Sequence, residues 1–319
     1  MAAVVSWLVA CGGTSSSGTT GSSNCDPTGG SGGSGTGGAA PSTSGSGAND
    51  VPSVTINFPG LVVPAGTEQQ GLVSAYVQNP EALWVREIEW SSTHVIHHGR
   101  LDAPPTPATQ FFPIYGLPVG AKAGVETLRD GYAVVLAPNQ ELRIAYHFVN
   151  TTPTDYVAEV QVTLRMAPPD APPPIPASLF ALLNEKFTIA PQSNFEVETT
   201  CPLPFDVTVL SLMPHQHGLG KGIDAWIVGG PNDGKLVYTT DTWEDAPITH
   251  FDPPLELKAG EQLRWVCRWQ NPKSDPVPAG QLADQEMCSI AGLYAPSVGP
   301  IGGGPLVEGG PCLTQVLNF

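Results

Sequence analysis

The sequence predicts an all-β fold of two tandem antiparallel β-sandwich domains of the jelly-roll type, and three observations support this prediction. Short segments in which apolar and polar residues alternate recur from residue 51 onward, and helical periodicity is nearly absent. Clusters of Gly, Pro, Asn and Asp separate these segments, which is typical of sandwiches and barrels. A Pro-rich segment divides the alternating segments into two groups, and 319 residues suffice for two domains.

Residues 1–50 differ in composition from the rest of the chain. They are mostly Gly, Ser, Thr and Ala with no Lys or Arg, so little apolar surface offsets the entropy of ordering, and we predict a flexible tether. An apolar run ends at Cys11 and resembles a bacterial lipobox, in which Cys11 would be lipidated, but it lacks the usual preceding positive charge. The run is too short to span a bilayer. We expect a signal for export and a protein of the cell envelope, lipid-anchored or secreted, that touches the membrane only through this anchor.

Two groups of predicted strands follow. In the first domain, residues 51–168, the clearest strand runs from Val157 to Met166, where apolar residues occupy the even positions from 160 onward. The segment 167–176 contains six prolines and cannot serve as a central strand, because proline has no N–H to donate. We predict that it is a semi-rigid connector. The second domain, residues 177–319, contains similar strands such as Val207–Leu212.

The charge of the chain limits its partners. With 13 basic and 29 acidic residues the formal net charge is −16, and the acidic residues are scattered along the sequence. This argues against nucleic acid and anionic lipid headgroups as partners. A scattered negative charge is also what keeps an ordinary exported protein soluble.

Five of the seven histidines occur in three close groups. In an extended strand, residues i and i+2 point to the same face, so His215 and His217 can present two imidazoles to one metal. The adjacent His97 and His98 would face opposite sides of an ideal strand, so shared ligation requires a bulge or a strand end there. His147 alone would be an ordinary core or surface histidine and becomes a candidate ligand only together with that pair.

The remaining two histidines are weaker candidates. His94 lies three residues before His97 and is either a solvated side chain or a group that orients a metal ligand. His250 lies in a turn-like stretch that ends in two prolines, and we predict a surface position for it.

The order of these groups resembles the copper type II ascorbate-dependent monooxygenases, which include the peptidylglycine α-hydroxylating and dopamine β-monooxygenases. In that family a first sandwich binds copper through an HH pair and a later single His, and a second sandwich binds copper through HxH and the Met of an EMC motif. Here the HH pair, the single His, the connector, the HxH pair and Glu286-Met287-Cys288 follow in that order, over roughly residues 80 to 315. Residues 218–221, GLGK, resemble the LGK of the family. The resemblance implies two coppers per chain, one held by His97, His98 and His147 and the other by His215, His217 and Met287.

Met287 and the cysteines support this assignment. A thioether is a soft ligand that suits Cu(I), although a buried methionine is by itself more often a filler of core gaps. Cys11 and Cys25 lie in the tether, and four cysteines in the second domain allow three pairings. The family resemblance favours the disulfides Cys267–Cys288 and Cys201–Cys312. An exported protein meets an oxidising compartment, which favours disulfides over thiolate ligands.

The resemblance also implies an activity. The chain would be an oxidoreductase that hydroxylates a C–H bond of a small organic substrate with O2 and ascorbate or another one-electron donor. Copper on His97, His98 and His147 would accept electrons, and the catalytic site would contain His215, His217 and Met287. The chain is expected to act as a monomer. A non-catalytic envelope protein that binds or stores copper is the alternative, and without the metal motifs a sandwich adhesion domain would be the leading interpretation.

The expected class of substrate is narrowed by the absence of the residues that hold a peptide carboxylate in the family. Peptide-amidating members hold the peptide carboxylate with an Arg two residues before the HxH pair and with Asn and Tyr after the EMC motif. The corresponding residues here are Met213, Ser289 and Ala291, so no cation stands there. We expect a smaller or more apolar substrate than a glycine-extended peptide.

Overall fold

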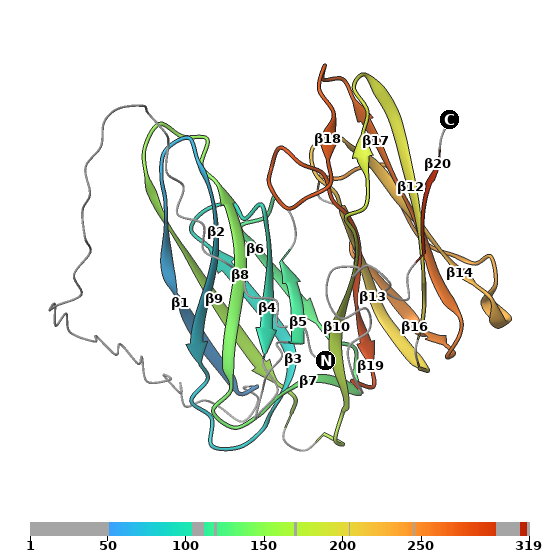
Figure 1. The fold of residues 1–319 in the computed structure, drawn as a ribbon. Coiled ribbons are helices and arrows are strands. Elements are labelled where there is room, and N and C mark those ends of the chain that lie inside the picture. Colours follow the sequence, from blue (N-terminus) through green and yellow to red (C-terminus); the bar gives the residue numbers. More distant parts are fainter. Residues whose placement is uncertain are drawn as a thin grey trace, which may run out of the picture. The chain divides into compact units, whose positions relative to one another are not determined.

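The computed structural model describes residues 51–103, 112–117, 120–168, 171–203, 205–244, 246–297 and 313–317. The predicted lipobox with Cys11, the tether with Cys25, and Cys312 lie outside these residues. The described part of the chain is almost entirely β-structure, so the all-β prediction is confirmed (Figure 1). Within it, no helix is long and apolar enough to cross a membrane.

The first sandwich is built from two facing sheets. Its strands are β1 (Ser53–Val63), β2 (Glu68–Tyr76), β3 (Leu83–Ser92), β4 (His98–Ala103), β5 (Phe112–Leu117), β6 (Ala123–Thr127), β7 (Tyr132–Leu136), β8 (Glu141–Val149) and β9 (Tyr156–Met166). One sheet has the order β1-β9-β3-β7, with β6 also paired to β3, and the other has the order β2-β8-β4-β5. Their inner faces share one apolar core, to which Ile56 of β1 and Leu142 of β8 both belong.

The second sandwich has the same construction. Its elements are β10 (Ile175–Asn184), β11 (Thr188–Ile189), β12 (Ser193–Pro202), β13 (Val207–His215), β14 (Gly220–Val228), the 3-10 helix η1 (Gly230–Asn232), β15 (Leu236–Thr240), β16 (Thr249–Leu257), β17 (Gln262–Asn271), β18 (Val277–Pro278), β19 (Cys288–Ala295) and β20 (Leu313–Leu317). One sheet has the order β10-β19-β13-β16 and the other β15-β14-β17-β12-β20. A second apolar core, with Val209 of β13 and Trp265 of β17, lies between them.

The alternation of residues along β8 places a histidine outside the first core. Leu142, Ile144, Tyr146 and Phe148 belong to that core. Because side chains alternate between the two faces of a strand, His147 lies on the opposite face of the sheet. It is nevertheless only 1 % exposed, so other parts of the chain must cover that face.

The Pro-rich connector differs in part from the prediction. Its last two residues, Ile175 and Pro176, open β10, and β10 pairs in parallel with β7 of the first sandwich through Ile175↔Tyr132 and Pro176↔Ala133. Proline is tolerated at a strand's start, where one missing donor interrupts little of the ladder. One sheet therefore continues from the first group of strands into the second, as the neighbouring β7, β10 and β19 show in Figure 1. The domain limits 51–168 and 177–319 remain a prediction.

A disulfide connects the two sheets of the second sandwich. Cys267 of β17 and Cys288 of β19 are bonded, which confirms that predicted pair. The indole Nε1 of Trp265 donates to Cys288 Sγ over 3.2 Å. Cys201 is also disulfide-bonded, and its pairing with Cys312 stays a prediction because Cys312 lies outside the described residues.

Loss of the Cys267–Cys288 bond is expected to lower the free energy of unfolding by about 3 kcal/mol, since it closes a loop with a sequence separation of 21. Urea unfolding of the Cys267→Ser/Cys288→Ser variant measures this loss. Cys25→Ser, which removes a cysteine of the N-terminal 50 residues, is the control and should unfold like the wild type. Mass mapping of the wild type that found a free thiol at Cys288 would contradict the expectation.

Candidate metal centre

The five histidines of the three sequence groups meet in one cluster. Seven pairs among their imidazole rings have centroids between 4.8 and 5.9 Å apart. The pairs cross between the two sandwiches: the ring of His97 lies 4.8 Å from that of His217, and the ring of His98 lies 5.2 Å from that of His215. The five predicted histidine ligands are therefore in direct contact with one another across the two sandwiches.

A strand end brings His97 and His98 to the same side. Strand β4 begins at His98, and His97 precedes it in irregular backbone. The N–H of His97 donates to the carbonyl of His147 over 2.8 Å. This hydrogen bond fixes the irregular backbone at His97 beside β8. His98 is the cross-strand partner of His147 in the β4–β8 pair. The strict alternation of a strand thus does not apply at His97, and both rings of the HH pair reach the cluster.

The two nitrogens of His147 have different neighbours. Its Nε2 lies 2.8 Å from Oε2 of Glu68 on β2, and its Nδ1 lies 3.2 Å from Nε2 of His98. A carboxylate accepts a hydrogen bond, so Nε2 carries the proton and Nδ1 keeps its lone pair toward the cluster.

The HxH pair lies at the end of β13. His215 is the last residue of that strand and pairs with Ser289 of β19, while His217 follows the strand in a turn closed by the Gly220 N–H on the His217 carbonyl. The Nδ1 of His217 lies 2.8 Å from the carbonyl oxygen of Gln285. The bond to this carbonyl places the proton on Nδ1 and leaves Nε2 free toward the cluster.

The carboxylate of Glu286 accepts hydrogen bonds that hold the HxH turn in place. One of its carboxylate oxygens accepts from the N–H of Leu219 over 2.7 Å, and the other accepts from the N–H of His217 over 3.0 Å and from Trp269 Nε1 over 2.8 Å. Burial raises the pKa of Glu286, and the bonds from Leu219, His217 and Trp269 oppose that shift. The Glu of the EMC motif therefore connects the segment before β19 to the HxH turn.

Close backbone packing after the HxH pair requires a glycine at position 222. Gly222 has φ +126°, and a Cβ there would lie 2.1 Å from the carbonyl oxygen of Thr240. Its N–H donates to the side chain of Gln216, whose Nε2 donates to the carbonyl of Arg268. Gln216, between the two histidines, thus anchors the turn to β14 and β17.

The histidines form two groups of three that could each hold a metal ion. One group is His97, His98 and His147, and the other is His98, His215 and His217, so His98 belongs to both. Within each group the candidate ligand atoms lie within 4.8 Å of one another. The buried Nε2 atoms of His97, His215 and His217 have no hydrogen-bond partner in the described part of the chain. A buried nitrogen without a partner is costly unless a ligand satisfies it, and imidazole is a ligand that suits copper, so these residues fit a copper ion.

Burial keeps these imidazoles neutral. Desolvation, reinforced by the charges of His217 and His147, lowers the pKa of His97 to about 4. Desolvation and the charges of His147, His97 and His217 lower the pKa of His98 to about 3. Burial also lowers the pKa values of His147, His215 and His217. Neutral imidazole is the form that coordinates a metal, so these histidines can bind a metal ion at neutral pH without first losing a proton.

Met287 lies where the HxH turn and β19 approach each other. It is 9 % exposed and immediately precedes Cys288, the first residue of β19. The β13–β19 register pairs Met213 with Ala291 and His215 with Ser289, which is two residues after Met287. Met287 is therefore close in the chain to the residue that pairs with the first histidine of the HxH pair.

His94 and His250 lie outside the cluster. The ring of His94 stacks on that of Tyr156 at 3.7 Å, and its Nδ1 lies 3.0 Å from the hydroxyl of Thr93. The side chain of His250 is 55 % exposed, in agreement with its predicted surface position, but it is part of β16 and its Nε2 lies 3.1 Å from the buried Glu126.

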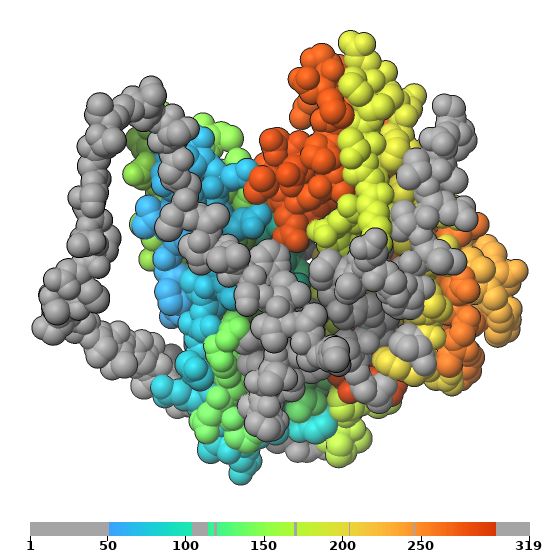
Figure 2. Space-filling view, viewed as in Figure 1, coloured from blue at the N-terminus to red at the C-terminus, as the bar shows by residue number. Residues whose placement is uncertain are grey.

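One short segment of the second sandwich contacts both groups of histidines. The carbonyl oxygen of Gln281 lies 3.4 Å from His98 Nε2, and the N–H of Ala283 donates to Glu68 Oε2 over 3.0 Å. We call Gln281–Glu286 the bridging segment, since Gln285 and Glu286 bind His217 as described above. In Figure 2 orange-red atoms of the second sandwich adjoin blue atoms of the first at this face.

Sequence reasoning did not find two carboxylates of this centre. Glu286 belongs to the EMC motif, but nothing in the sequence indicates that it binds the HxH turn. Glu68 lies in a strand far from every motif, and no sequence signal points to it.

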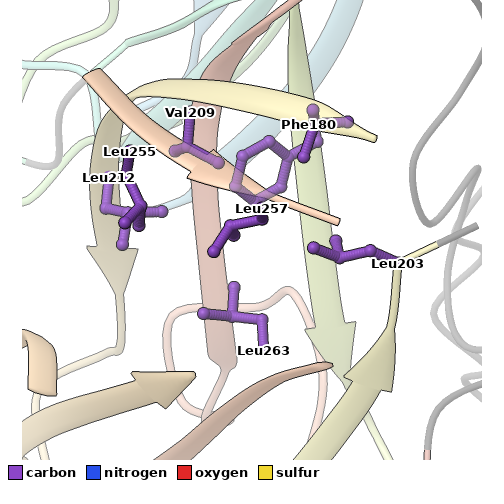
Figure 3. Close-up of a pocket in the computed structure, with 8 residues that line it drawn as sticks. Phe180, Leu203, Val209, Leu212, Leu255, Leu257 and Leu263 are labelled. Atoms are coloured by element: carbon purple, nitrogen blue, oxygen red, sulfur yellow. The ribbon is translucent and has the colours of Figure 1, made fainter. Parts of the chain in front are cut away.

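Two small cavities lie among the described residues. One, within the second core, has only apolar side chains around it (Figure 3) and therefore suits no metal or polar reactant; its lining residues are Phe180, Leu203, Val207, Val209, Leu212, Leu255, Leu257 and Leu263. The other lies between strands of the two sandwiches and includes the predicted substrate position Met213 in its lining, which is Tyr115, Glu126, Leu179, Ser211, Met213, Ile248, Gly292 and Leu293.

A comparison with protein families finds one match in the second half of the chain. Residues 177–299 match the family described as copper type II ascorbate-dependent monooxygenase, C-terminal domain. The match begins just after the Pro-rich connector and covers the HxH pair and Met287. It does not extend to residues 51–168, where the resemblance still rests on the HH pair and the single His.

Comparisons with curated proteins and with solved structures give no further indication of function. No curated protein matches the chain significantly. Similar solved structures include PNGF-II (13% identity, TM-score 0.35, covering 76% of this chain and 65% of that chain), the major capsid protein P2 of bacteriophage PM2 (9%, 0.32, 76% and 96%) and the exported protein XepA of PBSX (8%, 0.23, 76% and 86%). The chain thus spans about 65% of PNGF-II. TM-scores this low support no argument about function.

Proposed function

Because the chain belongs to the copper type II ascorbate-dependent monooxygenases through residues 177–299, we propose that it hydroxylates a C–H bond of a small organic substrate with O2 and ascorbate or another one-electron donor. The observation that supports this most is the pair of histidine groups that share His98, with three buried Nε2 atoms turned to no other partner. In the balanced reaction, substrate R–H, O2, two electrons and two protons give R–OH and water. Two ascorbate molecules would supply one electron each.

The proposed metal ligands form two sets. His97, His98 and His147 would hold one copper, and His215, His217 and Met287 would hold the other. Copper bound there would supply the one-electron redox steps and the activation of O2. The carboxylate of Glu68 and the carbonyl of Gln285 hold the outer nitrogens of His147 and His217, which fixes the tautomer that each ring presents. With His147 1 % and His217 0 % exposed, the chain also excludes bulk water from these rings.

Among the described residues, the surface that the substrate would meet beside His215 carries no cation. Met213 and Ala291 are cross-strand partners, as are His215 and Ser289, so Met213, Ala291 and Ser289 share the face of the sheet that carries His215. Leu293 and Ala295 of this face belong to the first core, so the face is directed toward the first sandwich. Among the described residues that line the cavity at Met213, the one acidic side chain is Glu126, whose pKa is raised by burial. We therefore propose a small or apolar substrate and not one recognised through a carboxylate.

The decisive experiment is oxygen consumption by the copper-loaded protein. After copper loading and desalting, elemental analysis should find two coppers per chain, and ascorbate should then drive O2 uptake with a panel of small C–H substrates. Zinc-loaded protein is the control and should consume none, because zinc does not change its oxidation state. Bound copper without any ascorbate-dependent O2 uptake would contradict the monooxygenase and favour the alternative, a non-catalytic envelope protein that binds or stores copper.

The proposed location follows from the sequence. We propose that the chain works as a monomer in the cell envelope, secreted or held by a lipid on Cys11, and that nucleic acid is not among its partners. Metabolic labelling with a fatty-acid analogue, in which Cys11→Ser loses the label, would test the anchor.

A further inference from the structure

We propose that Glu68 is a positioning residue of the histidine cluster. Its carboxylate holds His147 in the tautomer that presents Nδ1 to a metal, and it connects His147 to the bridging segment. The inference rests on the proposed function, since the metal concerned is the copper of that site. No motif contains Glu68, and its place is set by β2, where Gln70, two residues further along the strand, pairs with His147.

The carboxylate of Glu68 accepts two hydrogen bonds, and these support the proposal. Its Oε2 lies 2.8 Å from His147 Nε2 and accepts the N–H of Ala283 over 3.0 Å. An ionised carboxylate has no proton to donate, so the imidazole must donate from Nε2. The other nitrogen of His147, Nδ1, then carries no proton, and it lies 3.2 Å from His98 Nε2, inside the cluster.

Glu68 differs from the groups that orient the other rings. The Nδ1 of His217 contacts the backbone carbonyl of Gln285, and the Nε2 of His98 lies near that of Gln281. Among the described residues, Glu68 is the one carboxylate whose side chain contacts a ring of the cluster. It comes from the first sandwich and binds a segment of the second, so one oxygen atom connects His147 to the segment that also orients His217.

The negative charge of Glu68 has a redox consequence. A carboxylate that accepts the outer N–H of an imidazole makes the opposite nitrogen a stronger ligand. A more basic ligand set favours Cu(II) over Cu(I), because Cu(II) carries the higher charge. Without Glu68, copper should bind more weakly and the midpoint potential of the site should rise.

The test compares Glu68→Gln and Glu68→Ala with the control Glu185→Gln. Glu185 accepts from the side chain of Gln281 at 3.4 Å, so it touches the same segment without touching a histidine. Titration of Cu(I) against a chromophoric chelator should show one binding step weakened by about 10- to 100-fold in Glu68→Ala. Glu68→Gln keeps an acceptor oxygen without the charge and should lose less affinity. The midpoint potential should rise in both Glu68 variants and stay unchanged in Glu185→Gln.

A second measurement needs no metal. Long-range ¹H–¹⁵N spectra of the metal-free wild type should show the proton of His147 on Nε2, and Glu68→Ala should show a mixture of tautomers. A proton on Nδ1 in the wild type, or wild-type copper affinity and potential in both Glu68 variants, would overturn the proposal. Failure of the proposed function looks different: the wild type would bind copper and respond to Glu68 substitution, yet show no ascorbate-driven O2 uptake.

Discussion

Met287→Ala is expected to abolish ascorbate-driven O2 consumption while most of the copper on His97, His98 and His147 remains. Met287 lies two residues before Ser289, the cross-strand partner of His215, and is the soft ligand expected beside the HxH pair. None of the three first-group histidines lies in the same sandwich, so their copper should outlast the loss of the thioether. Oxygen-electrode measurements with ascorbate, together with copper analysis of the same samples, give both quantities.

A volume-matched variant separates ligation from packing. Met287→Leu keeps nearly the same volume and removes only the sulfur, so its effect on folding should be small and its loss of O2 consumption as complete as that of Met287→Ala. Met166→Leu makes the same exchange in the first core and should leave O2 consumption unchanged. Full O2 consumption by Met287→Leu would mean that Met287 only fills space in the core.

His98→Ala is expected to weaken the first site, where His98 is a proposed ligand, and to disturb the second, because the ring of His98 contacts those of His215 and His217. His98 is the histidine that both groups share, so its loss leaves two imidazoles in each group. Loss of a residue that merely orients a ligand costs about 10- to 100-fold in metal affinity, so loss of the ligand itself should cost at least that much at the first-group site. His97→Ala should affect mainly its own group. Chelator competition with copper counting measures both binding steps.

His94→Ala is the matched control for His98→Ala. His94 is also a histidine of the same chain segment, but it stacks on Tyr156 and lies outside the cluster. It should bind copper as the wild type does. If His98→Ala kept one copper at full affinity, the two groups would be independent and the shared position of His98 would have no role in metal binding.

The sequence predicted which five histidines lie together but not how they are arranged, and their role as ligands stays a prediction. Period-two alternation predicted β9 and the all-β fold, and the spacing of HH and HxH selected five histidines that do lie together. Short-range pattern can do this because it reports on the faces of single strands. It does not report how two sandwiches pack, so the predicted pair of separate copper sites gave no hint that His98 contacts His215 and His217.

The connector shows a second limit. Six prolines predicted a break between two groups of strands, and this boundary stays a prediction, yet Ile175 and Pro176 open β10, which joins β7 in parallel. The local rule on proline concerns a lost donor and tolerates the start of a strand. Likewise, Glu68 could not be found, because its role depends on a contact with a segment that is distant in the chain.

The bond between Glu68 and Ala283 joins positions 215 residues apart, and this sets the order in which the centre can be assembled. As the chain is synthesised, β2, β4 and β8 with their histidines emerge long before the bridging segment exists. Until then the outer face of β8 is uncovered, and His147 lacks the burial that keeps it neutral in the finished protein. The complete five-histidine cluster forms only after the second sandwich has closed, so a nascent chain carries, at most, a partial and water-exposed binding site for metal.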